Sequence, residues 1–437
     1  MSRSVKNALL FAAMAVLLVL VGTMQSWNVA LAILNMCLIS AIMTLGVNIQ
    51  WGYAGLFNAG VMGFTALGGL AAILISVAPV PAAWDAGGAR AMLGLLAGLA
   101  TIAGGVLLWK KLPVSRIARI WLTALLAVFG YGLMRLILDP AVDAIEAVQP
   151  AMTGFLGGFG LPIMFSWVVG GIFAAIVAWV IGKVALGLRS DYLAIATLGI
   201  SEIIIYFLKN EDWLTRGVKN VNGLPRPVPY EIDLQGALWL HDLAAWVGIP
   251  VVEASSLIVK LNYAALFLVV LIAIFWLSER ALKSPWGRMM RAIRDNEMAA
   301  GAMGKNVTGR HLQVFVLGSA VIGLAGAMLA TLDGQFTPAS YQPLRFTFLV
   351  WVMVIVGGSG NNLGSILGGF VIWFFWIEAE PIGLALMNFV TSGMAFDSPL
   401  RLHLLENAAH TRLMTMGLVL LLVLRFSPRG LIPEVKR

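Results

Sequence analysis

Three arginines at regular spacing mark residues 287–304, which read GRMMRAIRDNEMAAGAMG. Arg288, Arg291 and Arg294 recur every third residue, so on a helix they line one side. Guanidinium groups bind carboxylates in a two-pronged geometry, which suits a surface that pairs with an acidic protein partner. The alternative is a solvated loop whose arginines only set the membrane topology. Further residues complete the predicted docking surface, and most are small enough for a partner to approach the backbone: Glu297, Ala299, Ala300, Gly301 and Gly304.

Patterns typical of catalysis and metal binding are missing from the sequence. No GxxxxGK(S/T) loop occurs, so we expect the chain not to hydrolyse ATP by itself. The single Cys37 excludes an internal disulfide and a cysteine-based zinc site. The four histidines form no HExxH pattern: His241, His311, His403 and His410. We therefore predict no catalytic residue, no metal site and no cofactor in this chain.

The composition is that of a membrane protein. The chain has 437 residues, of which 60% are hydrophobic and 11% charged, with a mean hydropathy of +0.91. The sequence predicts an all-α polytopic fold of about ten to twelve transmembrane or re-entrant helices in a single membrane domain, 1–437. The candidate spans are 8–24, 29–49, 54–79, 92–109, 120–138, 163–186, 191–208, 262–277, 313–334, 345–358, 362–379 and 411–425.

Charge distribution predicts the orientation of these spans. With the N-terminus inside, most lysines and arginines fall in inside segments and most acidic residues fall outside. Both termini are therefore predicted to be cytoplasmic, with 278–312 as the largest cytoplasmic loop and 209–261 as an extracytoplasmic loop. The net charge of +8 is explained by these cytoplasmic segments, and no nucleic-acid partner is expected.

Several stretches resemble the bacterial branched-chain amino acid ABC permeases, in particular their LivM-type subunit. The most specific is residues 279–329, ERALKSPWGRMMRAIRDNEMAAGAMGKNVTGRHLQVFVLGSAVIGLAGAML. Three others are GYAGLFNAGVMGF at 52–64, RSDYLAIATLGISEII at 189–204 and GGSGNNLGSILGG at 357–369, and the closing RFSPRGLIP at 425–433 is also similar. The resemblance runs, with gaps, from about residue 30 to the C-terminus.

The resemblance implies a permease subunit in the bacterial inner membrane. Residues 297–304 give E-x-A-A-x-x-x-G, similar to the signature of a coupling helix that sits in a cleft of an ATP-binding subunit. It further implies a second permease, two ATP-binding subunits that hold ATP and magnesium, and a periplasmic substrate-binding protein. The substrate would be a branched-chain amino acid or a related small amide. Family members often carry Ser-Leu-Gly-His after the GYAG motif, whereas this chain has residues 57–60 as FNAG, which leaves the substrate open.

Candidates for the translocation path come from polar residues and helix-breaking glycines within the spans. They are Asn58, Gly60, Glu202, Gly358 and Gly360. A carboxylate inside a span is costly and often functional, but Glu202 has the alternative of pairing with a neighbouring span. The glycines line a cavity or simply allow close helix packing. The alternative function is an ion-coupled secondary transporter, which would need paired ionisable groups in the membrane, and the spans offer few.

Overall fold

Helices form nearly all the regular structure in the computed structural model, which describes residues 2–150, 153–188, 190–395 and 398–434. Within these residues, ten helices are long and apolar enough to cross a bilayer. The all-α polytopic prediction is therefore confirmed. The ten are α1 (Arg3–Met24), α2 (Trp27–Ala54), α5 (Ala89–Lys111, continuing α4, Pro81–Ala83, and the π-helical η1, Trp84–Gly88), α6 (Arg116–Glu146), α7 (Met164–Ala185), α8 (Ser190–Asn210), α12 (Val251–Lys283), α15 (Val307–Asp333), α17 (Asn362–Val390) and α19 (Thr411–Phe426, preceded by η4, Ala408–His410).

Two apolar helices are shorter. They are α3 (Val61–Ser76) and α16 (Pro343–Gly357). At 1.5 Å per residue α3 rises about 24 Å, which is less than the roughly 30 Å of a hydrocarbon core. The span predicted at 54–79 is therefore shorter than expected: α2 ends at Ala54 and is capped by Gly55, whose φ of 71° only glycine adopts readily, and residues 55–60 are not helical.

Other boundaries also differ from the prediction. The span expected at 262–277 begins at Val251, and the span expected at 362–379 continues past Pro381 to Val390. The remaining elements are α9 (Asp212–Thr215), η2 (Gly217–Lys219), α10 (Glu231–Gln235), α11 (Leu238–Val247), α13 (Pro285–Asp295), α14 (Glu297–Ala302), η3 (Pro338–Ser340), α18 (Pro399–Glu406) and the antiparallel strands β1 (Val221–Asn222) and β2 (Gln335–Phe336), in which Val221 pairs with Phe336.

The core of the bundle is formed by α2, α3, α7 and α15, which cross at very short range. A Cβ on Gly68 of α3 would collide with the backbone of Gly323 and Ala327 of α15. Gly170 of α7 closes the same crossing, because a Cβ there would lie 3.0 Å from the Gly68 Cα. Small residues let helix backbones approach each other in a bilayer, where burial of apolar area gives no driving force.

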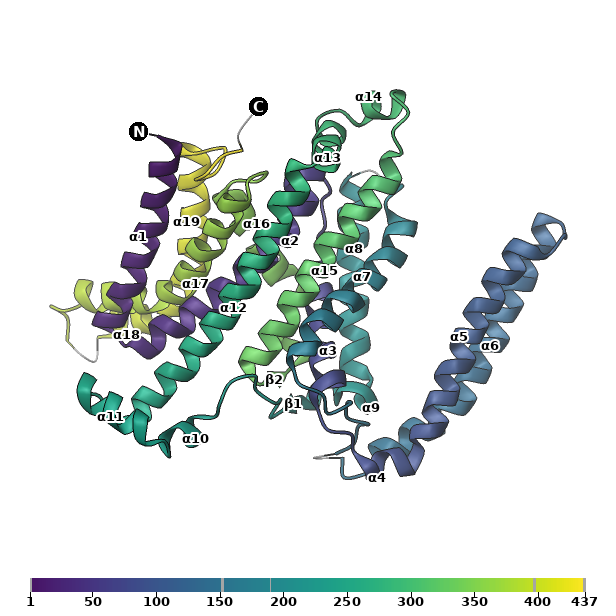
Figure 1. Ribbon diagram of the computed structural model, residues 1–437, viewed down its shortest axis with the longest axis horizontal. Coiled ribbons are helices and arrows are strands. Elements are labelled where there is room, and N and C mark those ends of the chain that lie inside the picture. The colour runs from purple at the N-terminus through teal and green to yellow at the C-terminus, as the bar shows by residue number, and fades with distance from the viewer. Residues whose placement is uncertain (1, 151–152, 189, 396–397, 435–437) are drawn as a thin grey trace.

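The bundle has two distinct ends (Figure 1). α13, α14, the start of α1 and the segment that follows α19 lie at one end, whereas α4, α9, α10, α11 and the β1–β2 pair lie at the other. The segments predicted to be cytoplasmic therefore share one end, and those predicted to be extracytoplasmic share the opposite end. The orientation of these ends in a membrane remains a prediction.

Candidate functional site

The first half of the predicted docking surface is α13, a short amphipathic helix that packs against the bundle. Its buried residues are Gly287, Met290 and Ile293, again spaced by three, so the arginines occupy the neighbouring side. Gly287 lies against the backbone of Leu282 at the end of α12, where any side chain would clash. The bundle thus holds α13 by its apolar side, and Arg288 is left exposed.

Arg294 is bound within its own chain. Its Nη1 donates to the carbonyl of Gly52 at the end of α2 and lies 3.0 Å from Glu434 Oε2, while Nη2 lies 3.1 Å from Asp295 Oδ1. Burial lowers the pKa of Arg294, but the hydrogen bond and charge of Glu434, with those of Asp295, outweigh it and raise the pKa above its usual value. Arg294 thus ties α13 to α2 and to the C-terminal segment.

Of the other two arginines, Arg288 is exposed and Arg291 is half-buried, as Arg294 is. Arg288 Nη1 donates to the Lys283 carbonyl at 3.3 Å and Arg291 Nη2 to the Leu282 carbonyl at 3.4 Å. Both carbonyls belong to the last turn of α12, where cations satisfy unpaired acceptors and complement the helix dipole. These long hydrogen bonds leave donors of both guanidinium groups available to other groups.

The second half of the docking surface, α14, is exposed except at Ala300, which is half-buried against the core. Asn296 caps it by accepting from the Ala299 amide at 2.9 Å, and none of its residues is buried. Met298 and Met303 are 86% and 80% exposed. A Cβ on Gly301 would meet no atom within 4 Å, so the described chain leaves this side open. Exposed methionines beside small residues are typical of an adaptable protein-binding surface.

A cavity of about 1160 Å³ is lined by α13, by the ends of α1 and α12 and by the turn before α17. A hydrogen-bonded chain leads from Glu279 in its lining to buried residues: Glu279 Oε1 accepts from Asn362 at 2.9 Å, and Asn362 accepts from Asn48 at 3.0 Å. Asn48 Oδ1 accepts in turn from the Gly360 amide at 2.9 Å. The lining includes Tyr53, Glu279, Lys283, Arg288, Arg291, Arg294, Gly360 and Glu434.

The candidates Gly358 and Gly360 lie in the turn between α16 and α17. Their φ angles are 119° and 80°, which β-carbon-bearing residues rarely adopt. The C-terminal segment pairs with this turn, since the amides of Leu431 and Ile432 donate to the carbonyls of Val356 and Gly357. The turn that contains these glycines therefore contacts two groups of residues: Asn48, with the residues hydrogen-bonded to it, and the C-terminal segment whose Glu434 pairs with Arg294.

Asn58 lies in a buried polar cluster around the non-helical segment 55–60. Asn58 Nδ2 donates to Gln50 Oε1 at 3.0 Å, and Gln50 donates to the Phe315 carbonyl and to Ser319 Oγ. Asn58 Oδ1 accepts from the Gly60 amide at 2.8 Å. Side chains of other helices accept from the neighbouring backbone amides. The amide of Ala59 donates to Thr197, the amide of Met62 to Thr347 and the amide of Gly63 to Ser201. This is how a bilayer protein tolerates irregular backbone in its interior.

Glu202 lies apart from this cluster. Its neighbour Ser201 faces α3, whereas Glu202 is exposed on the outer side of α8, and no described side chain pairs with it. The five path candidates thus occupy three places: Asn58 and Gly60 in the cluster, Gly358 and Gly360 in the turn, and Glu202 on the outer side. The sequence reasoning missed Asn48, Gln50, Glu279 and Asn362, although polar residues inside apolar runs are a usable signal.

Comparison with known proteins identifies the family. Residues 29–424 match the family described as the permease component of the branched-chain amino acid transport system. The chain belongs to this permease family. It is a multi-pass, non-enzymatic transmembrane component of an ABC transport system, which agrees with the missing nucleotide loop. Among the described residues, no group of three or more histidine, cysteine or acidic side chains could hold a metal ion.

Individual relatives of the permease are distant. It is 30% identical over 250 residues to the high-affinity branched-chain amino acid transport system permease protein LivM of Salmonella typhimurium, covering 55% of this chain and 54% of the relative. It is 26% identical to a probable LivM of Methanocaldococcus jannaschii, covering 60% and 67%. A fructose import permease of Rhizobium meliloti is 26% identical over a segment that covers 29% of this chain and 34% of the length of that relative. The permease spans about half the length of the Salmonella relative, and no solved structure matches it.

Proposed function

We propose that this chain is a permease subunit of an ATP-driven importer that moves branched-chain amino acids or related small amides across the inner membrane. A periplasmic binding protein delivers the substrate, and a second permease completes the path. Two ATP-binding subunits hold ATP and magnesium and bind at α13–α14. Family membership supports the transport class, and the names of the LivM relatives support the substrate class.

The observation that carries the proposal is the contrast between α13 and α14. Arg294 fixes α13 to α2 and to the C-terminal segment, while the residues of α14 other than the half-buried Ala300 are exposed. A partner that moves α14 would therefore act on α2 through a short rigid connection. Such a connection is what coupling between ATP hydrolysis and transport requires, because the two sites must bias one common element.

The orientation follows from the charge distribution. In this proposal both termini and α13–α14 are cytoplasmic, and α9–α11 face the periplasm. A cysteine introduced at Arg291 should react with an impermeant thiol reagent only from the cytoplasmic side, and one introduced at Asn222 only from outside. Native Cys37 is fully buried and should not interfere. The reverse labelling would overturn the orientation.

Glu202 supports a path along the outer side of α8. It lies well inside the candidate span Asp191–Asn210 and has no described partner. A carboxylate that faces lipid is costly, so such residues usually face a partner protein or a water-filled cavity. We therefore place the second permease, and the path between the two subunits, against this side of α8.

Bulky substitutions on α14 test the docking. Ala299→Trp and Gly301→Trp, at two exposed positions of α14, should reduce co-purification of the ATP-binding subunits and abolish uptake, because a large side chain displaces a closely packed partner. Gly187→Trp is the matched control, since Gly187 is also exposed with open space around it but lies in the α7–α8 turn. Full recovery of the ATP-binding subunits with both α14 variants would contradict the proposal.

Reconstitution tests the energy source and the substrate. The chain alone in liposomes should show no ATPase activity and no concentrative uptake, whereas the whole complex should accumulate leucine when ATP is supplied. Uphill uptake by the isolated chain, driven by an ion gradient, would instead support the secondary transporter. Competition by isoleucine, a small amide and fructose separates the two proposed substrate classes from the sugar named for the Rhizobium relative.

A further inference from the structure

The α5–α6 hairpin stands away from the bundle (Figure 1). Its principal contacts with the rest of the described chain are to α4, η1 and α9, all at its outer end. Beyond that end the two helices touch chiefly each other, through small residues such as Gly94 against Leu138 and Gly130 against Thr101. Large apolar side chains remain exposed along the pair, among them Ile102, Trp121 and Phe129 at 67%, 69% and 70%.

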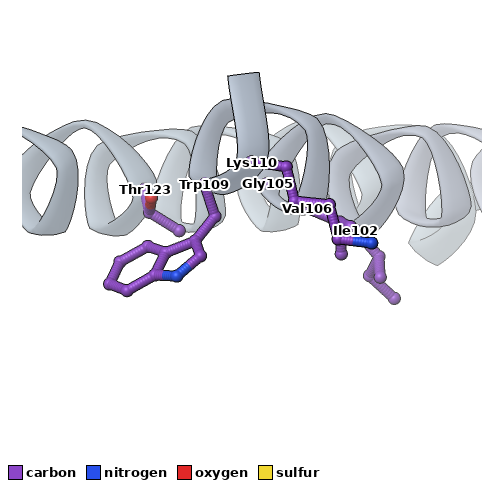
Figure 2. Close-up of a pocket in the computed structure, with 6 residues that line it drawn as sticks. All are labelled: Ile102, Gly105, Val106, Trp109, Lys110 and Thr123. Carbon is purple, nitrogen blue, oxygen red and sulfur yellow. The ribbon is translucent and has the colours of Figure 1, made fainter. Parts of the chain in front are cut away.

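A groove runs along the hairpin near its tip. It has a volume of about 360 Å³ and is lined by Ile102, Gly105, Val106, Trp109, Lys110 and Thr123. Figure 2 shows the side chains of Ile102 and Trp109 projecting from the same side of the helix pair, with Gly105 between them. A Cβ on Gly105 would meet only Thr123 Cγ2, at 3.8 Å, so the missing side chain leaves the groove open. The walls are almost wholly apolar and suit a hydrocarbon chain.

The tip of the hairpin is strongly basic. It carries Lys110, Lys111, Arg116 and Arg119, and no acidic residue occurs between positions 89 and 138. Arg119 is engaged internally, since its Nη2 donates to the Leu112 carbonyl at 3.1 Å and its guanidinium lies 5.8 Å from the Trp109 ring centre. Lys110, Lys111 and Arg116 are exposed, and no ion pair within the described chain involves them.

We propose that the α5–α6 hairpin binds an anionic phospholipid of the surrounding bilayer. One acyl chain lies in the groove beside Ile102 and Trp109, and the headgroup phosphate lies among Lys110, Lys111 and Arg116. An apolar groove that ends at unpaired cations complements an amphiphile with an anionic head. Trp109 reinforces the arrangement, because indoles favour the level of the headgroups. The inference does not depend on the transported substrate.

Photolabelling of the assembled transporter in nanodiscs tests this site. Two diazirine lipids with identical chains would be compared, one with a phosphatidylglycerol and one with a phosphatidylcholine head, and adducts mapped within residues 91–116. Each cation near an anionic headgroup favours binding about fivefold. The wild type should therefore be labelled at least about fivefold more by phosphatidylglycerol, and Lys110→Gln with Lys111→Gln should remove most of that preference.

Two further variants separate the groove from general attraction of charge. Gly105→Leu should reduce labelling by both lipids, because its side chain fills the groove without a steric clash. Arg425→Gln with Arg429→Gln removes two exposed cations far along the chain and should leave the preference unchanged. Equal labelling by both headgroups in the wild type would overturn the proposal. So would the absence of lipid adducts together with crosslinks from this hairpin to another subunit.

Discussion

Replacing Asn58 by leucine should destabilise the protein through its central polar cluster. The side chain is fully buried and makes two hydrogen bonds, to Gly60 and Gln50, at 2.8 and 3.0 Å. Leucine fits a similar volume but leaves the Gly60 amide and the Gln50 carbonyl oxygen without these partners. Because residues 55–60 are not helical, no backbone acceptor in a helix takes over the Gly60 amide.

The size of the effect follows from the two groups left unpaired. Each buried unsatisfied group costs about 1–3 kcal/mol, although hydrogen bonds measured between membrane helices average only about 0.6 kcal/mol. We expect the cost of leaving the Gly60 backbone amide unpaired to lie near the upper end of this range, since the chain fixes the position of this amide. We therefore expect a loss of about 2–4 kcal/mol in the free energy of unfolding. At about 2 °C per kcal/mol this lowers the melting temperature by about 4–8 °C.

The single cysteine provides the assay. Cys37 is fully buried in α2, the helix that also carries Gln50, so a thiol-reactive fluorophore reports unfolding as the temperature rises. Asn210→Leu is the matched control, because Asn210 is exposed and its side chain makes one hydrogen bond, to the Tyr206 carbonyl. Its melting temperature should stay close to that of the wild type. If Asn58→Leu and Asn210→Leu had the same melting temperature, the polar cluster would not stabilise the fold.

Three further predictions follow from other sites. Gly68→Ala should sharply reduce the yield of folded protein because its Cβ meets the α15 backbone, whereas Gly199→Ala, with no atom within 4 Å, should be tolerated; equal yields would refute the close crossing. Arg294→Gln and Glu434→Gln should each speed proteolysis of the C-terminal segment, and the double variant should add little, since both remove one ion pair; additive effects would argue against a shared role. Glu202→Gln should reduce uptake with an unchanged melting temperature, and normal uptake would remove it from the path.

The sequence by itself determined much of the fold. Apolar runs of bilayer length and glycine-rich packing stretches predicted an all-α membrane protein, and the charge distribution grouped the segments that share one end in Figure 1. Those features are local or additive along the chain, so no tertiary contact is needed to recognise them. The run from 279 to 329 likewise pointed to the permease family that the comparison established.

Tertiary structure decided how individual side chains are used. Arg288, Arg291 and Arg294 are equivalent by spacing, yet only Arg294 contacts Gly52 and Glu434. Both partners lie more than a hundred residues away along the chain, so the local spacing could not predict this difference. The break at residues 55–60 is another case: hydropathy continues across it, and side chains of α8 and α16 accept from the amide of Ala59 within it and from those of Met62 and Gly63 just after it. Periodicity reports which side of a helix a residue lies on. What lies opposite that side depends on packing between segments hundreds of residues apart.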